Sequence, residues 1–209
     1  MPTRRPPTTL HHPPPATPAG AHYPGPIAAP LDYPDPPLRG EAVVLRPFAA
    51  RDFGAAAAFA DEPDTSRWVP PLPADDADAV VAAFERYRAD GELLHLVVAD
   101  RGDDAYLGEV MLAVVEDGVG EVGCGVRAGC RGRGLATGAL RLLDHWSVTV
   151  LGIERLQAMV AEENTPGLDL AGRVGFRREG LLRAYWPSPG SRLDVVVFSM
   201  LPDEVPPVL

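Results

Sequence analysis

The stretch "CRGRGLATGAL", residues 130–140, determines how the rest of the chain is interpreted. Three glycines and two arginines lead directly into a helical pattern. The first N–H groups of a helix have no partner inside it, and they lie at the positive end of the helix dipole. A glycine turn that opens a helix is therefore a candidate anion site. The apolar residues that recur at steps of three and four are Leu135, Ala139, Leu142, Leu143, Trp146 and Val150.

A second glycine pattern lies just upstream. "GVGEVG", residues 118–123, has the G-x-G-x-x-G spacing of dinucleotide-binding turns. That spacing binds a pyrophosphate only where it follows a strand and opens a helix. The following residues, "CGVRAGCRG", have no helical period, so we interpret residues 120–126 as a strand. The anion site is therefore expected at the downstream turn.

The composition predicts one domain with an extended N-terminal tail. Of the 24 prolines in 209 residues, 13 lie in the first 39, and proline cannot donate to helix or sheet ladders. We predict a disordered tail over residues 1–39, a domain over residues 40–202 and a short C-terminal tail over residues 203–209. No apolar run is long enough for a signal peptide or a membrane span, which favours a soluble, cytoplasmic protein without a membrane partner.

The charge distribution favours a small anionic ligand over a polymer. A net charge of -10 argues against a nucleic-acid partner, because phosphate backbones bind basic surfaces. Arginines nevertheless gather around the glycine turn, at Arg127, Arg131, Arg133 and Arg141. The two cysteines lie six residues apart, with no CxxC motif and no clustered histidines, so we predict free thiols and no metal site.

The hydrophobic pattern predicts an α+β (mixed α/β) fold. Three successive strands over residues 92–126, separated by short turns, indicate an antiparallel meander. Helices and strands alternate after it. The predicted strands are residues 41–48, 92–100, 105–117, 120–126, 155–161, 176–186 and 192–201, and the predicted helices are residues 51–61, 75–90, 134–150 and 165–175.

In this setting the sequence resembles the GNAT superfamily of acetyl-CoA-dependent N-acetyltransferases, and within it the branch of the ribosomal-protein N-terminal alanine acetyltransferases. The resemblance covers most of residues 40–202, and the order and spacing of its motifs carry it. It implies a GNAT-like single domain with a twisted, mostly antiparallel central sheet of about six to seven strands and about four helices. The matching motifs are "VVLRPFAARD", "GEVGCGV", Arg-x-x-Gly-x-Ala at Arg131, Gly134 and Ala136, "ENTP" around Asn164, "GFRREGLLR" from Gly175, and Asp194.

The resemblance implies acetyl-CoA as co-substrate. In it, the turn from Arg131 to Ala136 wraps the CoA pyrophosphate, and the backbone from Cys124 to Val126 pairs with the pantetheine arm. Glycines let the backbone approach phosphate oxygens closely, and arginines add charge. For Asn164 two uses stay open, a hydrogen bond to the pantetheine arm or a cap on the following helix. The expected cofactor-binding residues are Cys124, Val126, Arg131, Gly132, Arg133, Gly134, Leu135, Ala136 and Asn164.

The implied reaction moves an acetyl group to a primary amine, on a peptide N-terminus or a small molecule, by direct attack in a ternary complex. A lysine-like amine costs roughly 4.6 kcal/mol to neutralise at pH 7, and an α-amine only about 1.1 kcal/mol. Glu121 is the first candidate for the catalytic base and Glu109 the second, with His95 and His145 as weaker candidates. A backbone N–H near Val126 is the expected donor to the thioester oxygen.

The sequence departs from its relatives at two positions. Many family members place a tyrosine where Ala171 stands, and the related branch often has a serine where Gly167 stands. Neither residue can protonate the departing thiolate. A non-catalytic acyl-CoA-binding sensor or interaction module is therefore the alternative hypothesis.

The amine acceptor itself has no readable motif, since acceptor specificity lies in loops. The loop through Trp68 and Pro71 is expected to form part of the acceptor wall. The acids between residues 61 and 78 lie where related proteins bind acceptors, so they either attract a cation or form a solvated face. A homodimer is possible, and the sequence does not decide it.

Overall fold

One sheet of eight strands runs through the part of the chain that the computed structural model describes, residues 29–69 and 71–207. The strand order is β1-β2-β3-β4-β5-β6-β8-β7, and the predicted meander is confirmed as β3, β4 and β5. Within these residues, the pairing of β5 with β6 is the only parallel one. The strands are β1 (Leu38–Arg39), β2 (Val43–Pro47), β3 (Leu93–Asp100), β4 (Tyr106–Glu116), β5 (Val119–Val126), β6 (Arg155–Ala161), β7 (Arg177–Ser188) and β8 (Ser191–Met200).

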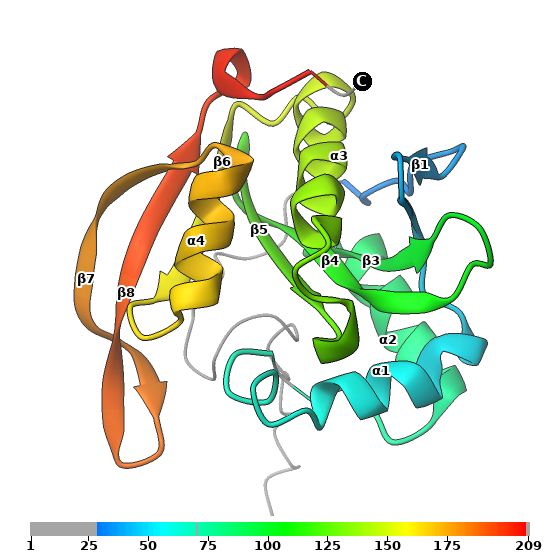
Figure 1. The fold of residues 1–209 in the computed structure, drawn as a ribbon. Helices are drawn as coiled ribbons and strands as arrows, with labels where there is room; N and C mark the ends of the chain where they lie inside the picture. The colour runs from blue at the N-terminus through cyan, green and yellow to red at the C-terminus, as the bar shows by residue number, and fades with distance from the viewer. Residues whose placement is uncertain (1–28, 70, 208–209) are drawn as a thin grey trace, which may run out of the picture.

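Helices cover both faces of the sheet. The helices α1 (Phe53–Ala60) and α2 (Ala77–Ala89) lie on one face, and α3 (Leu135–Thr149) and α4 (Thr165–Val174) lie on the other (Figure 1). The α+β class and the four predicted helices are confirmed. The sheet has one strand more than the seven predicted, because the two-residue β1 pairs with β2 and is too short to have a pattern of its own.

Strand alternation divides the interior into two cores. On β4, Val110 and Leu112 face α3, whereas Met111 and Ala113 face α1 and α2. Successive side chains of a strand point to opposite faces, so one strand supplies both cores. The side chain of Glu109 lies on the same face as Met111, toward α1 and α2.

The packed domain extends beyond both predicted boundaries. Leu31 is buried, its N–H donates to the carbonyl oxygen of Arg88 at 3.0 Å, and Tyr33 lies under the Arg88 guanidinium at 5.1 Å. At the other end, Glu204 pairs with Arg177 at 2.8 Å. The segment from Leu31 to β1 is therefore packed and not disordered as predicted, since proline restrains the backbone but leaves neighbouring side chains free to pack. The rest of that prediction, residues 1–28, lies outside the described residues.

Nowhere in the described segments is a helix long and apolar enough to cross a membrane. The cytoplasmic location stays a prediction.

Gly108 lies where the backbones of β4 and β5 approach each other closely. An added Cβ would overlap the carbonyl oxygen of Gly125 and lie 2.7 Å from the Cα of Val126. Backbone atoms in a central sheet cannot move away, so we expect Gly108→Ala to destabilise the fold by about 2–3 kcal/mol in urea denaturation. Gly129→Ala is the matched control, because nothing lies within 4 Å of its added Cβ. An unchanged midpoint for Gly108→Ala would contradict this close packing.

Candidate functional site

The site begins where two strands separate. The pairing of β5 with β6 covers only Val119–Glu121 against Arg155–Gln157, and β6 then follows β8 as far as Ala161. Figure 1 shows the sheet dividing here, with β3–β5 on one side and β7 and β8 on the other. A cavity with about 1190 Å³ of empty space, its open mouth included, runs through this fork from the α3/α4 face to the α1/α2 face.

Along the fork, one edge of β5 has no neighbouring strand among the described residues. The N–H of Arg127 donates to the carbonyl oxygen of Leu107 on β4 at 2.9 Å. Alternate residues of an antiparallel strand direct their polar groups to opposite neighbours, so those of Cys124 and Val126 point away from β4. They face the side where β6 has separated. Cys124 lines the cavity there with its backbone groups free, whereas the carbonyl oxygen of Val126 accepts from Nε of Arg131 at 3.2 Å and leaves only its N–H free.

The glycine turn lies at the end of β5, beyond the cavity wall. Gly132 and Gly134 adopt left-handed backbone conformations, with φ of 75° and 77°. The N–H of Gly138 makes the first hydrogen bond inside α3, to the carbonyl oxygen of Gly134, and no side chain of the described residues caps this helix. The N–H groups of residues 135–137 are therefore available to an anion.

Arg131 turns its side chain to the connection between α1 and α2. Its guanidinium donates to Glu62 and Asp64 at 3.3 Å and to Thr65 at 3.0 Å. Arg133 is exposed and forms no ion pair with any residue that the structure describes. Of the two arginines in the turn, Arg133 is thus the one whose charge is available to a phosphate.

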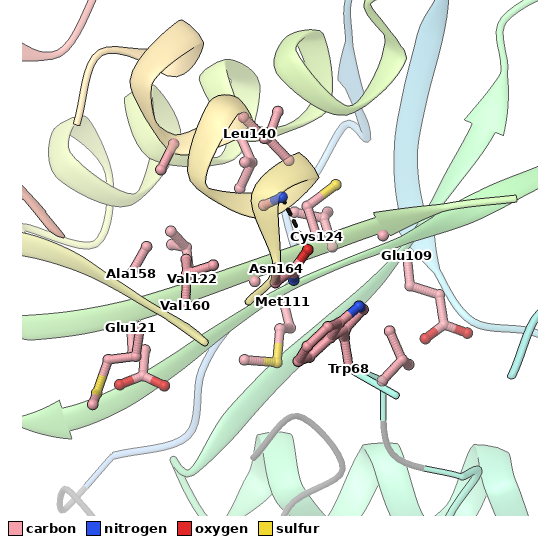
Figure 2. Close-up of a pocket in the computed structure, with 18 of the residues that line it drawn as sticks. Trp68, Glu109, Met111, Glu121, Val122, Cys124, Leu140, Ala158, Val160 and Asn164 are labelled. Carbon is pink, nitrogen blue, oxygen red and sulfur yellow. Dashed lines mark hydrogen bonds between the residues drawn. The ribbon is translucent and has the colours of Figure 1, made fainter. Parts of the chain in front are cut away.

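Asn164 opens α4 and lines the cavity. Its side-chain oxygen accepts from the N–H of Gly167 at 3.1 Å, drawn as a dashed line in Figure 2. The capping use of Asn164 is therefore present, and the amide nitrogen is left for a second partner. Gly167 and Ala171 also line the cavity, so the hydroxyl groups that relatives place at these positions would face it.

Glu109 is held in a buried network. Tyr106 donates its hydroxyl to Oε1 of Glu109 at 2.6 Å, and His95 contacts Oε2 at 2.9 Å. His95 in turn stacks on Phe84 at 3.9 Å. Burial alone would raise the pKa of Glu109, but His95 and Tyr106 outweigh it and hold the pKa below the usual range. Glu109 is therefore a carboxylate whose two oxygens are both engaged.

Glu121 has a different environment on the neighbouring strand. It is 7% exposed, lines the cavity, and accepts one hydrogen bond, from Gln157 at 3.1 Å. Burial raises the pKa of Glu121 and the bond from Gln157 opposes this only in part. A carboxylate with a raised pKa is a stronger base.

The two carboxylates cannot serve the same amine. Glu121 lies opposite Ala113 and Glu109 opposite Gly125, so they are four residues, or roughly 13 Å, apart along the strands. In the view of Figure 2, Met111 and Trp68 lie between them.

Several wall residues escaped the sequence analysis. Trp68 and Pro71 line the cavity as expected, whereas His145 and the acids between residues 61 and 78 do not. Alternation along the strands points to Met111 and Met159, but no local pattern marks the helix and loop positions. The wall residues missed are Phe59, Leu72, Phe84, Met111 and Met159, and Gln157 was missed as the donor to Glu121.

The described residues of this site offer neither a reactive thiol nor a cluster of metal ligands. Burial raises the pKa of the Cys124 thiol, which lines the cavity, to about 12. A thiol with so high a pKa is a poor nucleophile at neutral pH. Across residues 29–69 and 71–207, no three His, Cys, Asp or Glu side chains gather as a metal site requires.

Comparison with known proteins identifies the family. A model of the acetyltransferase (GNAT) domain matches residues 42–177. The chain belongs to the GNAT acetyltransferase family. It is an acetyl-CoA-dependent acetyltransferase, and the predicted family is confirmed.

Three individual relatives show how far the similarity of this GNAT protein extends. The "Uncharacterized N-acetyltransferase p20" of Bacillus licheniformis is 26% identical over 172 residues, which are 80% of this chain and 97% of the relative. RimJ of Mycobacterium smegmatis, solved with CoA-disulfide, is 26% identical with a TM-score of 0.70 over 79% of this chain and 85% of its own. A probable GNAT acetyltransferase from Chromobacterium violaceum is 29% identical, with a TM-score of 0.68 over 98% of each chain.

Proposed function

We propose that this protein acetylates a primary amine, on a peptide N-terminus or a small molecule, by direct attack on acetyl-CoA in a ternary complex. One observation carries the proposal. The fork brings the buried Glu121 and the unpaired backbone of Cys124 into one cavity, and the uncapped start of α3 follows at the end of β5, beyond the cavity wall. Both substrates can therefore meet inside one cavity, one from each face of the sheet.

The CoA arm would run along the α3/α4 side. The N–H groups of Leu135 and Ala136 and the backbone of Gly132 and Gly134 would hold the pyrophosphate, with charge from Arg133. The free backbone of Cys124 and the free N–H of Val126 would pair with the pantetheine amides as a neighbouring strand does. Asn164 would add its amide N–H, while Arg131 positions the turn against the α1–α2 connection rather than touching phosphate.

The acetyl transfer needs one proton acceptor and one oxyanion donor. The amine nitrogen attacks the thioester carbonyl carbon, the carbonyl oxygen is held by a backbone N–H of β5, and the carbon–sulfur bond breaks. Glu121 takes the proton that the amine loses. The leaving thiolate takes a proton from solvent, because Gly167 and Ala171 carry no hydroxyl. A thiol of pKa about 8.5 leaves as thiolate at a cost near 2 kcal/mol at pH 7.

Calorimetric titration with acetyl-CoA, followed by thiol release with a panel of amines, tests the proposal. Binding with amine-dependent thiol release supports it. Binding without release from any amine would favour the alternative, a non-catalytic acyl-CoA sensor. Absence of binding would overturn the assignment of the fork.

The glycine turn makes a prediction for the affinity of acetyl-CoA. Gly134→Val places a β-branched residue at φ 77°, where the strain is about 1–2 kcal/mol, so the turn should rearrange and weaken binding by about 5–30-fold. Gly138→Ala is the control, since its added Cβ meets nothing and its helical position favours alanine. Equal dissociation constants for both variants would exclude the turn from the binding site.

Two further expectations stay predictions. The first is that the protein shares the substrate specificity of the ribosomal-protein acetyltransferases, and the second is that it forms a homodimer.

A further inference from the structure

The α1/α2 end of the cavity is apolar. This acceptor end, as we call it, is the part of the cavity between the sheet and the α1–α2 connection. Its floor is bare backbone at Gly123 and Gly125, where an added Cβ would press on Met111 and Phe59. Large apolar side chains from five different elements surround that floor. They are Phe59, Trp68, Leu72, Phe84, Met111 and Met159.

Trp68 and Leu72 come from the α1–α2 connection, and contacts outside the cavity hold Trp68 in place. The guanidinium of Arg67 lies 4.8 Å from the centre of the indole ring, and it pairs with Glu163 beyond β6 at 3.1 Å. The indole also packs against the buried cluster of Ala161, Trp186 and Val195. A ring held by both contacts is a preformed surface for an apolar group.

The acceptor end offers a place for one positive charge and not for several. Two carboxylates line the cavity, and both oxygens of Glu109 are already hydrogen-bonded. Glu121 is the only carboxylate with an oxygen left among the described wall residues.

Three of the other acids of this region have partners of their own, and the remaining ones, Asp61, Asp75 and Asp78, do not line the cavity. Glu62 accepts from the N–H of Ala128 at 2.9 Å and from Arg131, Asp64 pairs with Arg131, and Asp76 caps α2 through the N–H of Ala79. None of the three lines the cavity. A polyamine or an aminoglycoside needs several carboxylates at the same site, because each buried cation must be paired.

We infer that the acceptor is a monoamine that carries a bulky apolar group, aromatic or branched aliphatic, next to its amine. The amine would lie at Glu121 and the apolar group between Trp68, Met111 and Phe59. A free arylalkylamine and a peptide that begins with a large apolar residue share this chemistry. The inference rests on the proposed function and names the substrate class of the same cavity.

Initial rates of thiol release at saturating acetyl-CoA test the inference on the full chain. The panel pairs phenylalanine amide and leucine amide with glycine amide, and adds 2-phenylethylamine, a peptide with N-terminal phenylalanine, spermidine and kanamycin. We expect kcat/KM to be about 10–100-fold higher for the apolar amides than for glycine amide, from burial of the added side chain. The two remaining phenyl compounds distinguish a free amine from a peptide. Equal rates for the amides, or a preference for spermidine or kanamycin, would overturn the inference.

Variants at Trp68 test whether the apolar wall of the acceptor end causes the preference for apolar amides over glycine amide. Trp68→Ala should lower the ratio of kcat/KM for phenylalanine amide to that for glycine amide by about 10-fold, whereas Trp68→Phe should keep this ratio. Parallel losses for both amides would show that Trp68 is only structural, and would count against the inference.

Calorimetry separates the inference from the proposed function. If no amine releases thiol, the proposed function fails, but phenylalanine amide, glycine amide and spermidine can still be titrated into the CoA-saturated protein. Tighter binding of phenylalanine amide supports the apolar acceptor end, and tighter binding of spermidine overturns it.

Discussion

Glu121→Gln is expected to lower kcat/KM for the best amine acceptor by about 10²–10³-fold, while the dissociation constant of acetyl-CoA stays within about twofold. Glutamine keeps the size of the side chain and the contact with Gln157, but it cannot take a proton. Steady-state thiol release and calorimetry on the same preparation measure the two quantities.

The pH profile gives a second readout for Glu121. Burial raises the pKa of this carboxyl group, and only the carboxylate acts as a base. Activity should therefore rise with pH along a limb that lies above the usual carboxyl range near 4.3. Glu121→Gln should lack this limb.

Glu109→Gln is the matched comparison. Its partners hold the pKa of Glu109 below the usual range, and both its oxygens are engaged. We expect this variant to lose stability through the His95–Tyr106 network and to keep the pH limb of the wild type. The opposite pattern, full activity in Glu121→Gln and loss of the limb in Glu109→Gln, would assign the base to Glu109.

Asp144→Leu is expected to raise the free energy of unfolding at pH 7 by about 2 kcal/mol, and the melting temperature by roughly 4–8 °C. Asp144 is 0% exposed in α3, and neither of its carboxylate oxygens has a hydrogen-bond partner within the described chain. An unpaired buried polar group costs free energy, and leucine fills a similar volume without that cost.

The effect should depend on pH in one direction. Burial raises the pKa of Asp144 well above its usual value, so the folded protein keeps this proton after the unfolded chain has lost it. Stability is therefore lost as pH rises above about 4, and the loss continues until the folded group ionises. The advantage of Asp144→Leu should be smallest near pH 4 and larger at pH 7.

Asp144→Asn separates titration from packing. It removes the ionisable group but leaves a buried polar amide, so its gain over the wild type should be smaller than that of leucine at each pH and should grow by the same amount from pH 4 to pH 7. Denaturant melts at pH 4 and pH 7 for the three proteins measure this. If the wild type and Asp144→Asn change in parallel between these pH values, then Asp144 does not titrate as inferred.

The elements of the domain could be predicted from the sequence because their signals are local. The helix after Gly134 has its apolar residues three and four positions apart, and the meander before it alternates between short turns. The family followed from motifs of a few residues each. β1 was missed because two residues are too few to form a pattern, and the packed segment around Leu31 was missed because its partner, Arg88, is 57 residues away.

The sequence by itself determined the four helices, the meander, the glycine turn and the choice of Glu121 and Glu109 as candidate bases, because periodicity, turn chemistry and residue type are properties of neighbouring positions. Only the tertiary structure decided what each group contacts. In the folded chain Arg131 donates to Glu62 and Thr65, and Glu109 is hydrogen-bonded to His95 and Tyr106. Glu121 lies beside Gln157 at the point where β5 and β6 separate. The physical reason is that the pKa and availability of a side chain depend on burial and on partners up to 69 residues away, which no local pattern records.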